Sequence, residues 1–345
     1  MIYRSKAPLR IGLAGGGTDV SPYSDQFGGA ILNASISLSA FASIEPLDEN
    51  KIIIQALDRH ETQQFDLSNE LPIDGTLDLL KGVYNRVQKD YPTPLKGFRL
   101  STFVDAPAGS GLGTSSTLVV SVLGAFFEML NLPFDEYRIA QYAYDIERND
   151  LQLSGGKQDQ YAATFGGVNF MEFYAGNKVI VNPLRIKPQY VHELENNLVL
   201  YFTSTSRESA SIIDEQVKNV NEKNVKSIDA MHHLKDQAKM MKEALLQGRL
   251  DEMGLILDYG FEQKRNMASK ISNAAIEEVY RAAKKAGATG GKISGAGGGG
   301  FMIFYCPGIS RHTVINTLNT FGGVVRNYSF TKHGLTTWTV PSISP

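Results

Sequence analysis

The sequence of 345 residues has little of what marks secreted, membrane or metal-stabilised proteins. Its single cysteine, Cys306, excludes an intramolecular disulfide, and no group of cysteines and histidines has the spacing of a zinc site. No run approaches the roughly 20 apolar residues that a helix needs to cross a bilayer, and residues 1–6 lack the apolar core of a signal peptide. We therefore expect a cytoplasmic, soluble protein with no membrane partner.

An excess of charge of either sign is also missing. The 34 lysines and arginines are offset by 36 aspartates and glutamates, which gives a formal net charge of -2 at pH 7. This balance argues against a broad nucleic-acid-binding surface, so no nucleic acid partner is expected. With 42% hydrophobic residues, the chain is long enough for a large core and for two domains. These properties are typical of a soluble enzyme or of a protein that binds small molecules.

A glycine-rich loop at residues 107–117, Pro-Ala-Gly-Ser-Gly-Leu-Gly-Thr-Ser-Ser-Thr, is the most informative stretch. A strand pattern at 98–104 precedes it, and apolar residues recur at helical spacing after it. The glycines permit positive φ and a close approach of backbone amides to a ligand, and the helix N-terminus adds unpaired donors. This geometry suits a polyphosphate. A purely structural interpretation, a tight turn with Thr114 or Ser115 as helix cap, also fits.

Two common nucleotide-binding loops do not match this stretch. A Walker A loop ends in Gly-Lys-Ser/Thr, whereas Gly113 is followed by Thr114, and a Rossmann fingerprint needs a third glycine at position 114. A second glycine-rich stretch, residues 290–300, contains Gly-x-Gly-x-x-Gly, but a strand pattern follows it instead of a helix. Its glycines predict a close backbone approach, either to a ligand or to the first glycine loop.

Charged residues stand at the ends of several predicted elements. Arg10 lies in a strand pattern that runs into three glycines and Asp19. Glu147 ends a helical pattern, where it opposes the helix dipole, so it is either solvated or compensated by a cation. Asp159 lies in the first turn of a short helical stretch, where a carboxylate can be purely structural. These residues are the candidates for chemistry.

The order of strand and helix patterns predicts an α+β fold of two domains. A break at residues 182–189 places the boundary, giving an N-terminal domain at 1–185, which contains the glycine loop, and a C-terminal domain at 186–345. Helical patterns fill most of 209–286, and strand patterns at 324–330 and 336–340 are expected to complete the sheet of the second domain.

Three motifs, at residues 6–19, 107–117 and 292–300, together resemble those of the GHMP small-molecule kinases in both order and spacing. Within that family, residues 7–23 are most similar to the kinases of D-glycero-D-manno-heptose 7-phosphate. The resemblance implies an N-terminal domain of the ribosomal S5 domain 2-like type and a ferredoxin-like C-terminal domain, with the active site between them. It also implies ATP and Mg²⁺ as cofactors, and it is compatible with a homodimer.

The resemblance assigns roles on the nucleotide side. Ser115, with Ser116 as its neighbour, and Glu147 match the positions that hold Mg²⁺. Asp159 matches the catalytic aspartate, which would accept the proton of the acceptor hydroxyl, and Arg10 would pair with it or stabilise the transferring charge. The ATP phosphates would lie on a loop formed by Pro107, Gly109, Ser110, Gly111, Leu112, Gly113, Thr114, Ser115 and Ser116.

On the acceptor side, Asp19 would hydrogen-bond sugar hydroxyls by analogy with the sugar-kinase members. An acceptor that already carries a phosphate needs cations, for which Lys157 and Arg207 are candidates, although a solvated surface position fits both. The full set predicted to bind the sugar phosphate is Gly17, Thr18, Asp19, Lys157, Arg207 and Gly297.

The implied reaction is ATP-dependent phosphorylation of the anomeric hydroxyl of D-glycero-D-manno-heptose 7-phosphate, giving the 1,7-bisphosphate for nucleotide-activated heptose. Two alternatives stay open at this point. One is a kinase of an unphosphorylated sugar of the fucose or galactose type. The other is a regulator that binds nucleotide and sugar without catalysis, against which the presence of Arg10, Glu147 and Asp159 argues.

Overall fold

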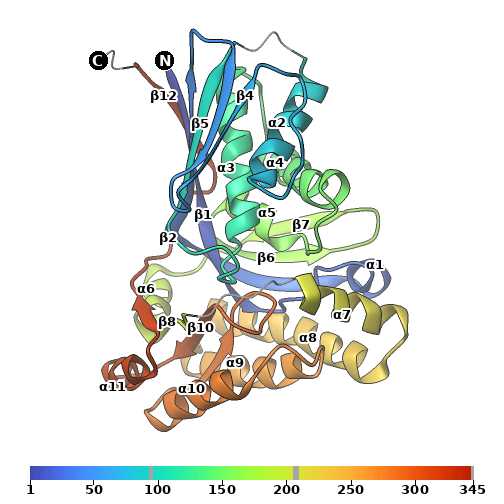
Figure 1. Ribbon diagram of the computed structural model, residues 1–345. Helices are drawn as coiled ribbons and strands as arrows, with labels where there is room; N and C mark the ends of the chain where they lie inside the picture. The colour runs from blue at the N-terminus through green and yellow to red at the C-terminus, as the bar shows by residue number, and fades with distance from the viewer. Residues whose placement is uncertain (93–95, 205–209, 343–345) are drawn as a thin grey trace.

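The computed structural model describes residues 1–92, 96–204 and 210–342, and its larger sheet organises the first half of the chain (Figure 1). The strands of this sheet are β1 (Ile2–Ala14), β2 (Gly29–Pro46), β3 (Lys51–Ala56), β4 (Glu61–Asp66), β5 (Phe98–Val104), β6 (Val168–Phe173), β7 (Val179–Pro183) and β12 (Thr336–Val340). Their order is β12-β1-β2-β5-β3-β4, and β6 pairs with both β2 and β7. The long β2 thus pairs with β5 through one end and with β6 through the other.

Helices cover one face of this sheet (Figure 1). They are α2 (Asp78–Asp90), α3 (Thr114–Met129), α4 (Glu136–Asp145), the π-helical turn η1 (Ile146–Asp150) and α5 (Gln158–Phe165). The short helix α1 (Tyr23–Phe27) lies elsewhere and packs against the second half of the chain, where the hydroxyl of Tyr23 is hydrogen-bonded to His232. α3 is apolar on nearly all sides because it lies between the sheet and the other helices, and Val119, Val122 and Phe126 are completely buried there. This central position fixes the N-terminus of α3, where the glycine loop ends.

The second half of the chain forms a smaller antiparallel sheet with helices packed against it. Its strands are β8 (Leu198–Phe202), β9 (Gly290–Ile293), β10 (Phe301–Tyr305) and β11 (Val324–Arg326), in the order β11-β8-β10-β9. Its helices are α6 (Pro188–Asn197), α7 (Ala210–Asn221), α8 (Val225–Gln247), α9 (Leu250–Arg265), α10 (Ala274–Lys285), α11 (Ser310–Leu318) and the 3₁₀ turn η2 (Asn319–Phe321). From β8 onward, strand, helices, two strands, helix and strand follow one another, which is the ferredoxin-like order.

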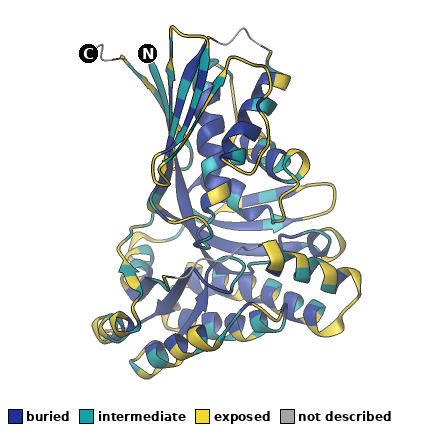
Figure 2. Cartoon of the chain, viewed as in Figure 1, coloured by how far each residue is buried: buried dark blue, intermediate teal, exposed yellow. Residues whose placement is uncertain are grey.

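The two halves share one hydrophobic core. Leu13 and Leu32 of the larger sheet lie in the same buried cluster as Met241 of α8, Leu257 of α9 and Ile303 of β10. Figure 2 shows the strands at this junction as buried. Because the apolar contact is continuous, the motifs on β1, α3 and β9 are held at fixed positions relative to one another.

The last strand does not belong to the sheet that the sequence predicts for it. Residues 336–340 pair with β1, from Ile2 opposite Val340 to Lys6 opposite Thr336, so the chain returns to the first sheet instead of completing the second. A strand pattern reveals a strand but not its partner, and β1 offers an open edge that β12 covers. The predicted strand at 324–330 is also shorter, with only Val324–Arg326 in β11. Within the described residues, no helix is long and apolar enough to span a membrane.

Candidate active site

Arg10 and Asp159 form a partly buried ion pair at the junction of the two halves, as the sequence predicts. Register shifts between β1 and β2 occur on both sides of Arg10, and such irregularities redirect side chains near functional sites. Nε and Nη2 of Arg10 both lie 2.7 Å from Oδ1 of Asp159, and Nη1 donates to the carbonyl oxygen of Gly111 at 2.5 Å. The pair therefore contacts the glycine loop directly.

The second oxygen of Asp159 is left for another partner. Both contacts from Arg10 use Oδ1, and Oδ2 accepts no hydrogen bond from any residue that the structure describes. The Asp159 side chain is 27% exposed, whereas that of Arg10 is 3% exposed. Oδ2 is thus the atom of this pair that can accept a proton from a ligand.

The glycine loop has the backbone geometry that the sequence predicts. Gly109, Gly111 and Gly113 have φ of 70°, 84° and 79°, and Gly113 is the N-cap of α3 without a side-chain capping bond. The interpretation in which Thr114 or Ser115 caps the helix is therefore wrong. A cavity beside the loop is lined by Gly109, Gly111, Gly113, Thr114, Ser115 and Ser116.

Three predicted loop residues do not line that cavity. Pro107 is exposed, while Ser110 and Leu112 are completely buried, with Leu112 in the core that the two halves share. The carbonyl oxygens of Leu112 and Ser110 accept hydrogen bonds from the backbone amides of Arg10 and Phe301, and these bonds tie the loop to strands β1 and β10. These residues shape the loop, and the other six line the cavity.

Gly113→Ala should abolish most activity with a modest loss of stability. A Cβ there would lie 3.1 Å from Cγ of Asp159, and the positive φ adds about 1–2 kcal/mol of strain. Gly176→Ala is the matched control, because Gly176 has φ of 68° and open space around a Cβ. Thermal unfolding should show a similar loss for both variants, while kcat should fall only for Gly113→Ala. Equal kcat values in both variants would contradict this placement.

The second glycine stretch packs on the first. Oγ of Ser294 donates to the carbonyl oxygen of Gly111 at 2.8 Å, and a Cβ on Gly295 would lie 2.6 Å from Cα of Gly111. Of the two expectations for these glycines, contact with the first loop is the one that the structure shows. Gly297, predicted to bind substrate, instead packs against Ile271, and its neighbours Gly295 and Ala296 line the cavity.

Glu147 lies in the π-helical turn η1 and is 2% exposed, so the solvated interpretation is wrong. Oγ of Ser116 donates to its Oε1 at 3.0 Å, and Nε2 of Gln160 donates to its Oε2 at 2.5 Å. Burial raises the pKa of Glu147, while Arg148 and the two hydrogen bonds oppose this rise. Ser116, not the exposed Ser115, is the hydroxyl that contacts Glu147, because the helical turn after Gly113 directs Ser116 inward.

The oxygen atoms beside the loop suit a magnesium ion. Mg²⁺ is usually bound by one or two carboxylates together with substrate phosphates. Glu147, Ser115 and Ser116 line the same cavity as the loop and supply hard oxygen ligands. In the described parts of the chain, no group of three or more His, Cys, Asp or Glu residues forms a self-sufficient metal site. A metal ion here would therefore rely on Glu147 and on the phosphates of a nucleotide.

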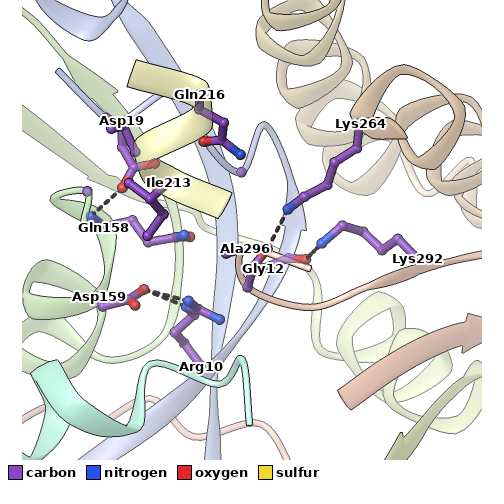
Figure 3. A pocket seen from close by; sticks show the side chains of 15 residues that line it. Arg10, Gly12, Asp19, Gln158, Asp159, Ile213, Gln216, Lys264, Lys292 and Ala296 are labelled. Carbon is purple, nitrogen blue, oxygen red and sulfur yellow. Dashed lines mark hydrogen bonds and ion pairs between the residues drawn. The ribbon is translucent and has the colours of Figure 1, made fainter. Parts of the chain in front are cut away.

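A second cavity opens on the other side of the ion pair (Figure 3). Asp19 lies on one wall, and Lys264 of α9 and Lys292 of β9 lie on the opposite wall. The two cavities share the residues Arg10, Gly156, Asp159, Ile213, Gly295 and Ala296. The ion pair therefore stands where a ligand on the glycine loop would meet a ligand in the second cavity.

The predicted acceptor residues are only partly brought to this second cavity. Asp19 and Gly17 line it, and Oδ2 of Asp19 accepts from the backbone amides of residues 157 and 158 at 2.8 and 3.0 Å. Burial raises the pKa of Asp19, an effect that the amide of residue 158 reduces. Thr18 does not line the cavity, because its hydroxyl donates to the carbonyl oxygens of Gly15 and Ala30.

Lys157, one of the two predicted phosphate-binding cations, does not line this cavity. Nζ of Lys157 points toward Asp25, at 3.6 Å, and the residue lines neither cavity. The turn at residues 155–156 brings the backbone of Lys157 next to the site, but a sequence pattern does not give the direction of its side chain. Arg207 lies outside the described residues.

Two buried lysines, Lys264 and Lys292, line the cavity although they are not among the residues predicted from the sequence. Each position nevertheless carries a signal in the sequence. Lys264 lies three residues after Phe261 on the buried face of α9, where a lysine is unusual, and Lys292 is the first residue of the third motif. Only the fold shows that these two positions face Arg10.

Comparisons with known proteins agree with this architecture. The family models "GHMP kinases N terminal domain" and "GHMP kinases C terminal" match residues 78–167 and 241–322. The chain is 45% identical to D-glycero-alpha-D-manno-heptose 7-phosphate kinase of Campylobacter jejuni, over 98% of this chain and 99% of that protein.

Solved structures agree with this family and show the same fold. A Bacteroides thetaiotaomicron structure described as a D-glycero-D-manno-heptose 1-phosphate kinase superimposes with a TM-score of 0.84 at 45% identity, covering 99% of this chain and 100% of that one. Mevalonate kinase of Methanococcus jannaschii, at 20% identity, shares the fold with a TM-score of 0.75 over 96% of this chain and 98% of that one. The predicted two-domain α+β fold is confirmed, and the chain belongs to the GHMP kinases, as a sugar kinase that transfers a phosphoryl group to an alcohol.

Proposed function

We propose that this kinase uses Mg²⁺ and ATP to phosphorylate the anomeric hydroxyl of D-glycero-D-manno-heptose 7-phosphate, giving the 1,7-bisphosphate for nucleotide-activated heptose. One observation carries the proposal. The cavity at the glycine loop and the cavity with Asp19 meet at the Arg10–Asp159 pair. A nucleotide on one side and a sugar on the other would thus face each other across a carboxylate that can accept a proton.

The transfer step follows from the atoms at this junction. The acceptor hydroxyl gives its proton to Oδ2 of Asp159 as its oxygen forms a bond to the γ-phosphorus, and the bond from phosphorus to the leaving oxygen breaks to release ADP. Arg10 holds the carboxylate through Oδ1 and adds positive charge beside the transferring group. The backbone amides of the glycine loop hold the nucleotide phosphates.

Glu147 and Ser116 would hold the magnesium ion, with Ser115 beside them on the wall of the cavity. Bound there, Mg²⁺ supplies positive charge that offsets the negative charge of the nucleotide phosphates. Gln160 keeps Glu147 and Ser116 in place, because its Nε2 donates to both of them.

An apolar cavity next to the loop suits the adenine base. Leu77 and Leu79 of α2 and its preceding turn line it together with Leu118 of α3. Leu153 lines both this cavity and the one at the glycine loop, so the two adjoin. A flat apolar base in the first and phosphates in the second would match the chemistry of the two walls.

The identity of the acceptor sugar is a more specific part of the proposal than the type of reaction. The names of the two similar proteins place a phosphate on different carbons of the heptose, at position 7 in one and at position 1 in the other. We propose the 7-phosphate, whose anomeric hydroxyl is free to accept the phosphoryl group. Heptose 1-phosphate, whose hydroxyl at position 7 is free, is the competing acceptor in the test below.

An acceptor panel tests the function. ADP release would be measured with heptose 7-phosphate, heptose 1-phosphate, unphosphorylated heptose, fucose and galactose, and the product would be located by ³¹P NMR. We expect the highest kcat/KM with heptose 7-phosphate and a new phosphate resonance coupled to the anomeric proton. Preference for fucose or galactose would replace the proposed substrate, and no ADP release with any sugar would contradict the proposed function.

A further inference from the structure

Lys264 and Lys292 reach the acceptor cavity from two different elements of the second half of the chain. Lys264 is 2% exposed on α9, and Lys292 is 4% exposed on β9. Nζ of Lys264 donates to the carbonyl oxygen of Gly295, and Nζ of Lys292 donates to that of Gly12 at 2.8 Å. In Figure 3 both ammonium groups point toward the centre of the cavity.

These two lysines have no carboxylate partner among the described residues. Each ammonium group has three donors, and the structure assigns one protein acceptor to each. Buried lysines are normally paired, because a lone buried charge is costly. Lys81 follows that rule in the same molecule, with Nζ 2.5 Å from Asp74 and 3.0 Å from Asp78.

Arg10 adds a third positive charge to the same space. The three cations are close enough that Lys264 and Arg10 both lower the pKa of Lys292, after burial as the main cause. Two buried ammonium groups without a carboxylate partner, next to a guanidinium group, are typical of an anion-binding site.

We infer that Lys264 and Lys292 together bind the phosphate group that the acceptor sugar already carries, and so select a phosphorylated acceptor. This inference rests on the proposed function and names the residues that give it its substrate specificity. The two lysines take the role that the sequence had suggested for Lys157.

The placement favours the phosphate of the acceptor over that of ATP. Lys264 and Lys292 line the cavity with Asp19 but not the one with the glycine loop and Glu147. In Figure 3, Arg10 lies between Asp159 and the two lysines. A sugar whose hydroxyl meets Asp159 would therefore extend its far end toward the lysines.

The pH dependence of acceptor binding follows from Lys264. Burial is the main cause that lowers the pKa of Lys264 to about 8, with a smaller contribution from Arg10 in the same direction and an opposing one from Asp19. Below pH 8 the side chain is protonated and attracts phosphate, and above pH 8 it becomes neutral. Sugar phosphates are dianions above about pH 6, so KM for the phosphorylated acceptor should be lowest between about pH 6 and 8. The charged groups that line the cavity around this lysine are Arg10, Asp19, Asp159 and Lys292.

Kinetics of Lys264→Met and Lys292→Met test the inference. Each variant should raise KM for heptose 7-phosphate about 10- to 100-fold, the range for losing a charge-assisted hydrogen bond, with KM for ATP and kcat/KM for unphosphorylated heptose nearly unchanged. Lys270→Met, an exposed lysine outside the site, is the control and should match the wild type. An equal loss with both sugars, or a rise confined to KM for ATP, would overturn the inference.

A binding experiment on the wild-type protein needs neither turnover nor a folded variant. Inorganic sulfate, a tetrahedral dianion that does not titrate near pH 8, would be added with a non-hydrolysable MgATP analogue on the glycine loop. Calorimetry in buffers of different ionisation enthalpy should show uptake of protons at pH 8, because a bound anion favours charged Lys264. Absence of sulfate binding, or binding without proton uptake, would overturn the inference. If sulfate binds this way but heptose 7-phosphate is not phosphorylated, the site stands and the proposed substrate fails.

Discussion

Asp159→Asn is expected to lower kcat by about 10²- to 10⁴-fold, the usual contribution of a positioned proton acceptor. The asparagine keeps an oxygen that can accept both hydrogen bonds from Arg10, which in the wild type end on the single atom Oδ1. The substitution replaces the other oxygen by an amide nitrogen, which cannot accept a proton. The KM values for ATP and for the sugar should therefore change little, and the loss should appear in kcat.

Steady-state kinetics with both substrates varied, together with thermal unfolding, check this expectation. Asp236→Asn is a suitable control, because Asp236 is 62% exposed on α8 and pairs only with Lys239 within the described residues. It should keep wild-type kcat. A kcat for Asp159→Asn within tenfold of the wild type would show that another group accepts the proton.

Glu147→Gln is expected to lower kcat/KM for MgATP by about 10²- to 10³-fold, as for the loss of one preorganised electrostatic contact. The same substitution should stabilise the metal-free protein. Because burial raises the pKa of Glu147, the native state holds its proton more tightly than the unfolded chain does. Stability therefore falls as pH rises from the ordinary pKa of a glutamate through the raised pKa of Glu147, because the buried side chain becomes charged, and glutamine removes this cost since it carries no charge.

Thermal unfolding with and without Mg²⁺ and an ATP analogue separates these effects. Without metal, Glu147→Gln should unfold at a higher temperature than the wild type. With Mg²⁺ and the analogue, the wild type should gain stability and the variant should gain much less. A variant that gains as much as the wild type would mean that Glu147 does not hold the metal ion.

The glycine loop and the elements next to it could be predicted from the sequence, because each depends on residue types at neighbouring positions. The three positive-φ glycines and the helix after them follow from residue types at neighbouring positions, and Asp159 was expected in the first turn of a short helix. The inward position of Ser116 was not predicted, because one residue of helical rotation separates it from the exposed Ser115.

The acceptor side depends on contacts between distant segments, which no local pattern reveals. Lys264 and Arg10 are far apart along the chain and meet only because α9 packs beside β1. Lys157 shows that nearness of the backbone is not enough. Its backbone amide donates to Asp19, but its ammonium group points toward Asp25. The pairing of β12 with β1 was missed for the same reason.

A crystal structure with heptose 7-phosphate and a non-hydrolysable MgATP analogue tests the central claim most directly. We expect the γ-phosphate on the glycine loop, the anomeric hydroxyl within hydrogen-bonding distance of Oδ2 of Asp159, and the sugar phosphate between Lys264 and Lys292. A sugar bound away from the Arg10–Asp159 pair, or oriented with its phosphate toward the glycine loop, would contradict the account.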